Sequence, residues 1–200
     1  MEKIKELKNY FKYLKIDGYI VPKNNKFFGE YVSFNDDNLK YISNFSGSSG
    51  FAMLLKDKNY IFVDGRYTIQ ANIECGQNFK ICNLPDELPF KIFAKKKLII
   101  GFDPKLHTEN SLKTLFSKSQ IKLMPVEENL VNKIWKSKKS LKNYPFYQLK
   151  QKATGESSNK KILKLKKIIR ANKADYFLIT ASENIAWLLN IRGYDSEYTP

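Results

Sequence analysis

Strand-sized and helix-sized patterns alternate along the first 135 residues, and this alternation constrains the fold more than any other feature. Short apolar runs alternate with segments in which apolar residues recur every three or four positions. We expect strands at residues 16–21, 51–55, 60–63, 79–82, 98–102 and 121–125. We expect helices at residues 2–15, 36–42, 67–75, 86–93, 110–117 and 128–135. Such alternation is typical of α/β layer folds.

One connection makes the sheet mixed rather than purely parallel. The polar residues 56–59 join two of the expected strands directly, which is a hairpin pattern, and hairpin strands run antiparallel. Strands joined through helices run parallel. The polar, aromatic segment 23–50 is rich in Asn, Ser and Gly, and we expect a long ordered loop there. The predicted fold is therefore α/β, with a mixed sheet flanked by helices.

The composition changes after Trp135, which indicates a second unit. Residues 136–153 are rich in Lys, contain Pro145 and read as a basic linker. A helix at 160–171, a strand at 176–180 and a helix at 182–189 follow. These three elements do not complete a sheet. We expect domain I at residues 1–135, the linker at 136–153, and at 154–200 the start of a second, similar and incomplete α/β domain.

The charge is concentrated at this junction. The chain has 35 basic and 20 acidic side chains, a net charge of +15, and residues 133–173 alone hold 14 basic groups and one acidic group. Three interpretations stay open: a solvated linker and helix face, a surface that binds phosphate, and a surface that docks on another domain or subunit. The first is favoured, because the segment lacks interleaved Arg and aromatic residues. We therefore expect no nucleic-acid partner.

Several functional classes are excluded by missing features. No apolar run approaches the ~18–20 residues of a membrane span, and the N-terminus does not read as a secretory signal, so we expect a cytoplasmic protein. Cys75 and Cys82 are expected to be idle thiols rather than a disulfide. The single histidine, His107, is expected to be structural. With no metal-binding or nucleotide-binding motif present, the sequence indicates no catalytic residue and no metal ligand.

Six segments carry a resemblance to a known family. They occur in the family's order at residues 17–22 (with the pair 30–31), 42–50, 63–67, 100–104, 125–135 and 180–193. The third contains the sequence DGRY and the last contains NIAWLLNIRG. The chain resembles the N-terminal part of cytosolic Xaa-Pro aminopeptidases (aminopeptidase P), in the creatinase/prolidase family. It departs from the family pattern at Asn44, where a glycine is usual.

The resemblance implies a metal-dependent hydrolase that removes the N-terminal residue preceding proline. It also implies a homodimer with no membrane association, acting on peptides with proline at the second position. In this family two divalent metal ions, manganese or zinc, lie in a C-terminal "pita-bread" domain that these 200 residues lack. We therefore expect this chain to be a substrate-gating and dimerisation part that binds no cofactor and is inactive alone. The alternative is a stand-alone, shortened interaction module without catalytic activity.

The resemblance singles out Arg66 as the substrate-binding residue of this chain. A guanidinium can hold a peptide carboxylate or carbonyl with paired hydrogen bonds, and Arg is scarce here, with only three among 35 basic residues. The alternative is a local ion pair with Asp64. Asp64 is expected to cap the following helix, and Gly65 and Tyr67 to complete the turn.

Two further segments are candidates. In residues 46–50, Gly47 and Gly50 are expected to shape a turn beside the site, and an alternative is that backbone N–H groups there bind an anion. In the second unit Trp187 is expected to pack in a core. Arg192 and Asp195 are expected to be interface residues.

Overall fold

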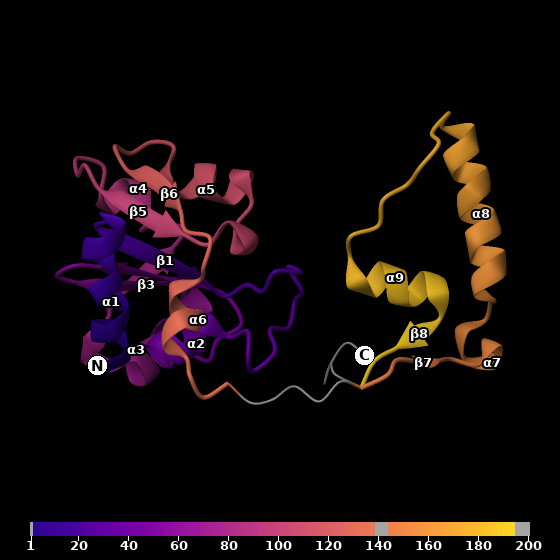
Figure 1. Cartoon of the computed structure of the whole chain (residues 1–200), viewed down its shortest axis with the longest axis horizontal. Helices are drawn as coiled ribbons and strands as arrows, with labels where there is room; N and C mark the ends of the chain where they lie inside the picture. The colour runs from indigo at the N-terminus through magenta and orange to yellow at the C-terminus, as the bar shows by residue number, and fades with distance from the viewer. Residues whose placement is uncertain (1, 139–143, 195–200) are drawn as a thin grey trace. The chain divides into compact units, whose positions relative to one another are not determined.

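The computed structural model describes residues 2–138 and 144–194 and divides the chain into two compact units (Figure 1). Unit 1 comprises Met1–Phe28 and Val32–Lys139, and unit 2 comprises Gly29–Tyr31 and Ser140–Pro200. Among the described residues, no helix is both long and apolar enough to cross a membrane.

Unit 1 is built on a six-stranded mixed sheet in the order β4-β3-β2-β1-β5-β6. The strands are β1 (Gly18–Pro22), β2 (Phe51–Leu55), β3 (Asn59–Asp64), β4 (Lys80–Leu84), β5 (Ile99–Phe102) and β6 (Lys122–Pro125). β2 pairs antiparallel with β1 and β3, and the other pairs are parallel. The predicted mixed α/β fold is confirmed, and each strand predicted in this unit forms with its ends shifted by at most two residues.

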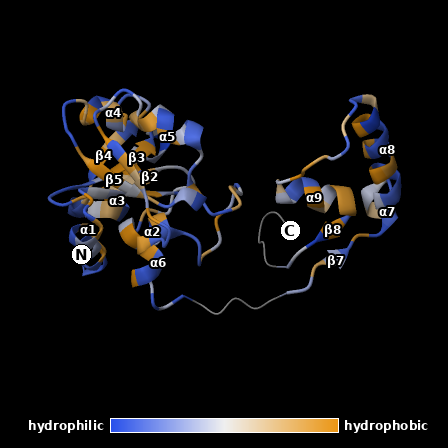
Figure 2. Cartoon of the chain, turned by 45° about the horizontal axis from the view of Figure 1, so that its top comes forward, coloured by the Kyte–Doolittle hydropathy of each residue, from blue (hydrophilic) through white to orange (hydrophobic). Residues whose placement is uncertain are grey.

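Helices cover both faces of this sheet (Figure 1). They are α1 (Glu2–Leu14), α2 (Asn38–Ser43), α3 (Thr68–Cys75), α4 (Pro89–Ile92), α5 (Glu109–Phe116) and α6 (Leu130–Ile134), with 3-10 turns η1 (Gly65–Tyr67), η2 (Gly76–Asn78) and η3 (Pro104–Leu106). α1, α2, α3 and α6 pack in one hydrophobic cluster, and α5 packs in the other. Figure 2 shows the hydrophobic residues concentrated along the strands between these layers.

The central strand β1 shows why the pattern produces this architecture. All five of its residues are buried, since Tyr19 and Val21 point into one cluster while Ile20 points into the other. The covering helix α1 buries only Ile4, Leu7 and Phe11, its residues at three- and four-residue spacing. A strand with both faces covered reads as a continuous apolar run, as this one does.

The long loop between β1 and α2 forms as expected, without regular secondary structure. An ion pair holds its two ends, because Lys23 Nζ lies 2.6 Å from Asp37 Oδ2 and both side chains are about nine-tenths buried. Asp37 also caps α2, since its Oδ1 accepts a hydrogen bond from the Lys40 backbone N–H at 3.1 Å. The loop is therefore anchored at both ends beside the sheet.

Unit 2 contains three helices and a short antiparallel pair of strands in its described part. They are α7 (Gln151–Thr154), α8 (Ser158–Ala171), α9 (Ser182–Leu189), β7 (Tyr147–Gln148) and β8 (Ile191–Arg192). The predicted strand at 176–180 does not form. Tyr176, Phe177 and Leu178 are 92%, 60% and 84% exposed, because no strand among residues 144–194 pairs with this segment.

The interior of unit 2 is polar. Among residues 144–194 the only buried side chains are Lys161 and Asn190. Lys161 Nζ donates to Trp187 O and to Asn190 Oδ1, both at 2.7 Å, and lies 4.1 Å from the centroid of the Trp187 ring. The prediction that Trp187 packs in a core is wrong in this structure, since the side chain is 59% exposed.

Candidate functional site

Arg66 lies in the turn that leaves the end of β3. Asp64 caps this turn, because its Oδ1 accepts hydrogen bonds from the Arg66 backbone N–H and from Arg66 Nε, both at 2.9 Å. The hydrogen bonds from Arg66 hold the pKa of the Asp64 carboxyl below its usual value. The ion pair considered as the alternative role of Arg66 is therefore present.

The ion pair leaves part of the guanidinium available. Nη2 of Arg66 lies 3.5 Å from Asp64 Oδ2, and within the described part of the chain Nη1 makes no hydrogen bond. The Arg66 side chain is 73% exposed and its guanidinium lies 5.5 Å from the centroid of the Tyr67 ring. Asp64 thus orients the guanidinium while its outer edge stays accessible to a carbonyl or carboxylate.

The backbone of this turn does not require a glycine at the position of Gly65. Its φ lies outside the left-handed region, and a Cβ added there would meet nothing within 4 Å. Gly50 differs, because its φ is +145° and an added Cβ would lie 2.7 Å from Phe62 O. At Gly47 an added Cβ would collide with the ring of Phe45. Close contacts therefore disfavour any side chain at Gly47 and Gly50, and both positions favour glycine.

The neighbouring loop begins with a left-handed residue. Asn44 ends α2 with φ 67° and ψ −5°, and its N–H bonds to Lys40 O at 2.8 Å. Asn tolerates this conformation better than most residues, so the family's usual glycine is not needed to make the bend.

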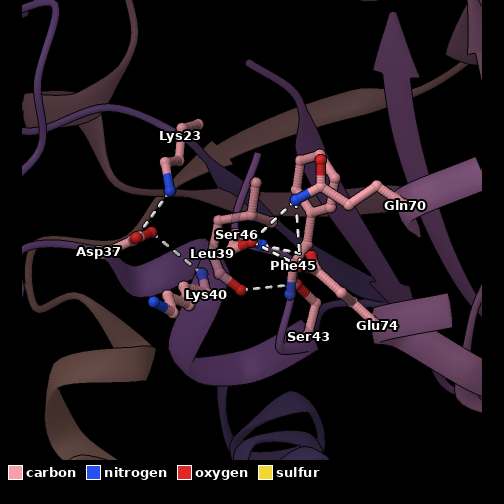
Figure 3. Close-up of polar contacts among 9 residues, drawn as sticks. All are labelled: Lys23, Asp37, Leu39, Lys40, Ser43, Phe45, Ser46, Gln70 and Glu74. Carbon is pink, nitrogen blue, oxygen red and sulfur yellow. Dashed lines mark hydrogen bonds and ion pairs between the residues drawn. The ribbon is translucent and has the colours of Figure 1, made fainter. Parts of the chain in front are cut away.

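A carboxylate of α3 holds the start of this loop (Figure 3). Ser46 donates its backbone N–H to Glu74 Oε2 at 2.7 Å and its hydroxyl to Glu74 Oε1 at 2.5 Å. Gln70 Nε2 donates to Ser46 Oγ at 2.8 Å and to Glu74 Oε1 at 3.0 Å. Burial alone would raise the pKa of Glu74, but these hydrogen bonds and the charge of Lys40 outweigh it and lower the pKa.

This contact bears on the anion site considered for residues 46–50. The backbone N–H of Ser46, which such an anion would use, already binds the carboxylate of Glu74. The loop thus uses an internal anion as part of its own structure.

The loop and the Arg66 turn are joined directly. Ser48 Oγ and the Tyr67 hydroxyl lie 2.7 Å apart, and the rings of Tyr67 and Phe45 meet edge to face with centroids 5.8 Å apart. Thr68 Oγ1 donates to Asn83 Oδ1 at 2.8 Å and so ties the start of α3 to β4. The structure therefore brings Arg66, Asp64, Gly65, Tyr67, Gly47 and Gly50 together at one edge of the sheet.

Glu74 and Gln70 are neighbours of the candidate site that the sequence analysis did not predict. They are four residues apart on one helix face, but their partner Ser46 is 28 residues from Glu74 along the chain. The only sequence signal is a Gln–Glu pair at this spacing, which is common on solvated helices.

The remaining candidates belong to the second unit of the chain. Arg192 belongs to β8 of unit 2, where its Nη1 donates to Ile191 O at 2.7 Å and to Ala186 O at 3.3 Å. Asp195 lies outside the described residues. Among residues 2–138 and 144–194, no group of three or more His, Cys, Asp or Glu side chains is arranged to hold a metal ion.

The histidine is half-buried and both cysteines are buried. Burial lowers the pKa of His107 to about 4, and its Nε2 has no hydrogen-bond partner in the described structure. Cys75 and Cys82 are free thiols, as predicted, and burial raises the pKa of each to about 11.

Comparisons with known families match both units. Residues 3–134 match the family described as Creatinase/Prolidase N-terminal domain, and residues 136–200 match a second family with the same description. "Probable Xaa-Pro aminopeptidase P" of Coprinopsis cinerea is 32% identical over 97% of this chain and 33% of its own length. "Xaa-Pro aminopeptidase 1" of Dictyostelium discoideum is 30% identical over 100% of this chain and 34% of its own length.

A solved structure is similar over the same extent. The crystal structure of an X-prolyl aminopeptidase from Caenorhabditis elegans, described as a cytosolic enzyme with a di-nuclear active site, superposes with a TM-score of 0.85. It is 26% identical and covers 97% of this chain and 35% of that one. The present chain thus spans about a third of the length of these relatives and corresponds to their N-terminal part.

Proposed function

Because this chain belongs to the creatinase/prolidase N-terminal domain family, we propose that it is the substrate-gating and dimerisation part of a metal-dependent Xaa-Pro aminopeptidase. The observation that carries the proposal is the collinear similarity of nearly the whole chain to the N-terminal third of such enzymes. The intact protein would be a cytoplasmic homodimer that removes the residue preceding proline.

The proposed domain boundaries are residues 1–135, 136–153 and 154–200, and the division after residue 135 is supported by the two family matches, which meet there, and by the two compact units. Arg66 would bind the peptide substrate through its outer edge while Asp64 keeps it oriented. The two metal ions, manganese or zinc, would be held by residues that correspond to the other two thirds of the relatives. Within unit 2, Arg192 and Asp195 would face a neighbouring domain or subunit.

The test is a chimera. Residues 1–200 replace the matched N-terminal third of the Dictyostelium relative, and hydrolysis of a peptide with proline at the second position is measured with manganese or zinc. We expect the chimera to hydrolyse the peptide and the 200-residue chain alone to be inert. Turnover by the chain alone, lost when its own residues are substituted, would refute the proposed division of labour.

A second candidate function, a stand-alone interaction module, is favoured by the exposed apolar side chains of unit 2, including Ile185, Trp187 and Leu189. Light scattering on the 200-residue chain tests it. Stable self-association would support the module, and a monomer at all concentrations would count against it.

A further inference from the structure

Two contacts orient the guanidinium of Arg66, and the first of them is weak by itself. It is the ion pair with Asp64, whose side chain is 42% exposed while that of Arg66 is 73% exposed. Ion pairs with this much exposure contribute little and do not hold a long side chain in one orientation. The second contact is the ring of Tyr67, whose centroid lies 5.5 Å from the guanidinium carbon. Because one contact holds an edge of the planar group and the other supports its face, the place of the Tyr67 ring helps to set where Arg66 points.

The loop after α2 holds this ring on two sides. The Tyr67 hydroxyl lies 2.7 Å from Ser48 Oγ, and the ring meets that of Phe45 edge to face with centroids 5.8 Å apart. Phe45 is fully buried, whereas Ser48 is exposed. The buried ring therefore supports the body of the Tyr67 side chain, and the hydroxyl of Ser48 fixes its outer end.

Glu74, in the last turn of α3, fixes the start of the same loop (Figure 3). Three donors converge on its carboxylate: the backbone N–H of Ser46 at 2.7 Å, the hydroxyl of Ser46 at 2.5 Å and Gln70 Nε2 at 3.0 Å. Gln70 Nε2 also donates to Ser46 Oγ at 2.8 Å. Hydrogen bonds to an ionised acceptor are stronger than neutral ones, so Ser46 is held firmly against α3.

Gly47 transmits this restraint from Ser46 to Ser48. The backbone at Gly47 lies directly against the ring of Phe45, because a Cβ added there would collide with that ring. The chain between the two serines therefore has little room to adjust. A displacement of Ser46 is expected to displace Ser48, and with it the Tyr67 hydroxyl.

We propose that Glu74 is a positioning residue for Arg66, and that it acts through the two serines of the loop and the ring of Tyr67. Within the described part of the chain no hydrogen bond joins Glu74 to Arg66, so the effect is transmitted by the residues between them. The effect on substrate binding rests on the proposed function. The placement of the guanidinium does not, and it can be measured without substrate.

The first test observes the guanidinium in the 200-residue chain. The chain has only three Arg residues, so the Arg Nε–H resonances of isotope-labelled protein are few, and Arg66→Lys identifies the one of Arg66. In Glu74→Gln a donor replaces one acceptor oxygen, and one of the three converging donors loses its partner. We expect the Arg66 Nε–H to exchange with solvent about 2–5-fold faster, the factor that corresponds to one exposed contact between a cation and a ring. The control is Glu109→Gln, since Glu109 is an exposed carboxylate of α5 that pairs with Lys113.

A milder variant accompanies Glu74→Gln. Ser46→Ala removes the hydroxyl that Glu74 and Gln70 share, at an exposed position, and leaves the backbone N–H bonded to the carboxylate. It is expected to accelerate the exchange in the same direction. Unchanged exchange in both variants would overturn the proposal, and so would an equal acceleration in Glu109→Gln.

Tyr67→Phe tests the path itself. This substitution removes the hydroxyl that meets Ser48 and keeps the ring. We expect it to accelerate the exchange of the Arg66 Nε–H, and Glu74→Gln to add little to it, because both substitutions interrupt one path. Full additivity of the two effects would contradict this path.

The second test measures peptide hydrolysis by the Dictyostelium chimera. Glu74→Gln is expected to raise KM about 3–10-fold with little change in kcat, because a displaced guanidinium weakens substrate binding. A substitution that only unfolded part of the protein would lower the apparent kcat and leave KM unchanged, since the folded molecules would be unaltered. In an Arg66→Ala background Glu74→Gln is expected to have no further effect on KM. An undiminished effect in that background would contradict a role through Arg66.

Failure of this inference and failure of the proposed function are distinguishable. Faster Arg66 exchange in Glu74→Gln, together with a chimera that hydrolyses no peptide, would contradict the function and leave the placement of Arg66 by Glu74 standing. An active chimera whose KM is unchanged by Glu74→Gln would overturn the positioning role and leave the function standing.

Discussion

The ion pair between Lys23 and Asp37 provides a quantitative test of unit 1. Lys23→Met removes the ammonium and leaves a carboxylate that is 11% exposed, with only the Lys40 N–H as partner. Asp37→Asn leaves an ammonium that is 9% exposed, without its counter-ion. Removing one partner of a buried pair costs about 3–5 kcal/mol. Because both groups keep some contact with water, we expect about 3 kcal/mol for each substitution.

The double variant measures the interaction between the two charged side chains separately from the cost of each single substitution. With both charges gone no unpaired buried charge remains, so the double substitution is expected to cost at most about 3 kcal/mol rather than about 6. The coupling free energy between the two positions would then be at least about 3 kcal/mol. A domain with ordinary stability of about 5–15 kcal/mol would remain folded in each variant.

Urea denaturation followed by tryptophan fluorescence measures these values. Trp135 is 7% exposed and stacks on Tyr41 with ring centroids 4.3 Å apart, so it reports on unit 1. A Trp187→Phe background removes the second tryptophan of the chain, which lies in unit 2. A single-variant cost below about 1 kcal/mol, or simple additivity in the double variant, would refute the reasoning.

Two further predictions concern pH and backbone strain. The pKa of His107 is about 4 in the folded state and about 6.5 unfolded, so the unfolded state binds the extra proton between these values and stability falls as pH drops from about 6.5 to 4. Urea titrations should show this loss in the native chain and a flatter profile in His107→Phe. Gly50→Ala should cost about 3 kcal/mol by thermal denaturation, because of its φ and the contact with Phe62 O, whereas Gly65→Ala should be nearly neutral. Equal costs for the two glycines would contradict this reading of the loop.

The sequence predicts unit 1 well because an element that is buried on one or both faces carries apolar residues at a recognisable spacing. β1 is a continuous apolar run, and α1 places Ile4, Leu7 and Phe11 at helical spacing. The segment 176–180 has the same apolar character, yet it forms no strand, because a strand is defined by its neighbours as well as by its own residues.

Only part of the candidate site can be predicted from the sequence. Asp64 and Arg66 are two residues apart, so a cap and a local ion pair can be anticipated from the sequence. The contact of Ser46 with Glu74 and Gln70 joins a loop to a helix, and such a contact leaves no periodic signal. The sequence also gives no signal for the polar interior of unit 2 around Lys161, because nothing distinguishes this Lys from the others in a Lys-rich helix.

The kcat/KM of the Dictyostelium chimera with substitutions at Arg66 tests the central claim most directly. Arg66→Ala is expected to lower kcat/KM on a peptide with proline at the second position about 10–100-fold, the loss of one charged hydrogen bond. Arg66→Lys should recover only part of it, since Lys lacks the planar fork. The control is Lys58→Ala. Lys58 is an exposed cation that immediately precedes β3, at the end of the strand opposite to Arg66. An Arg66→Ala chimera as active as its Lys58→Ala counterpart would contradict the account.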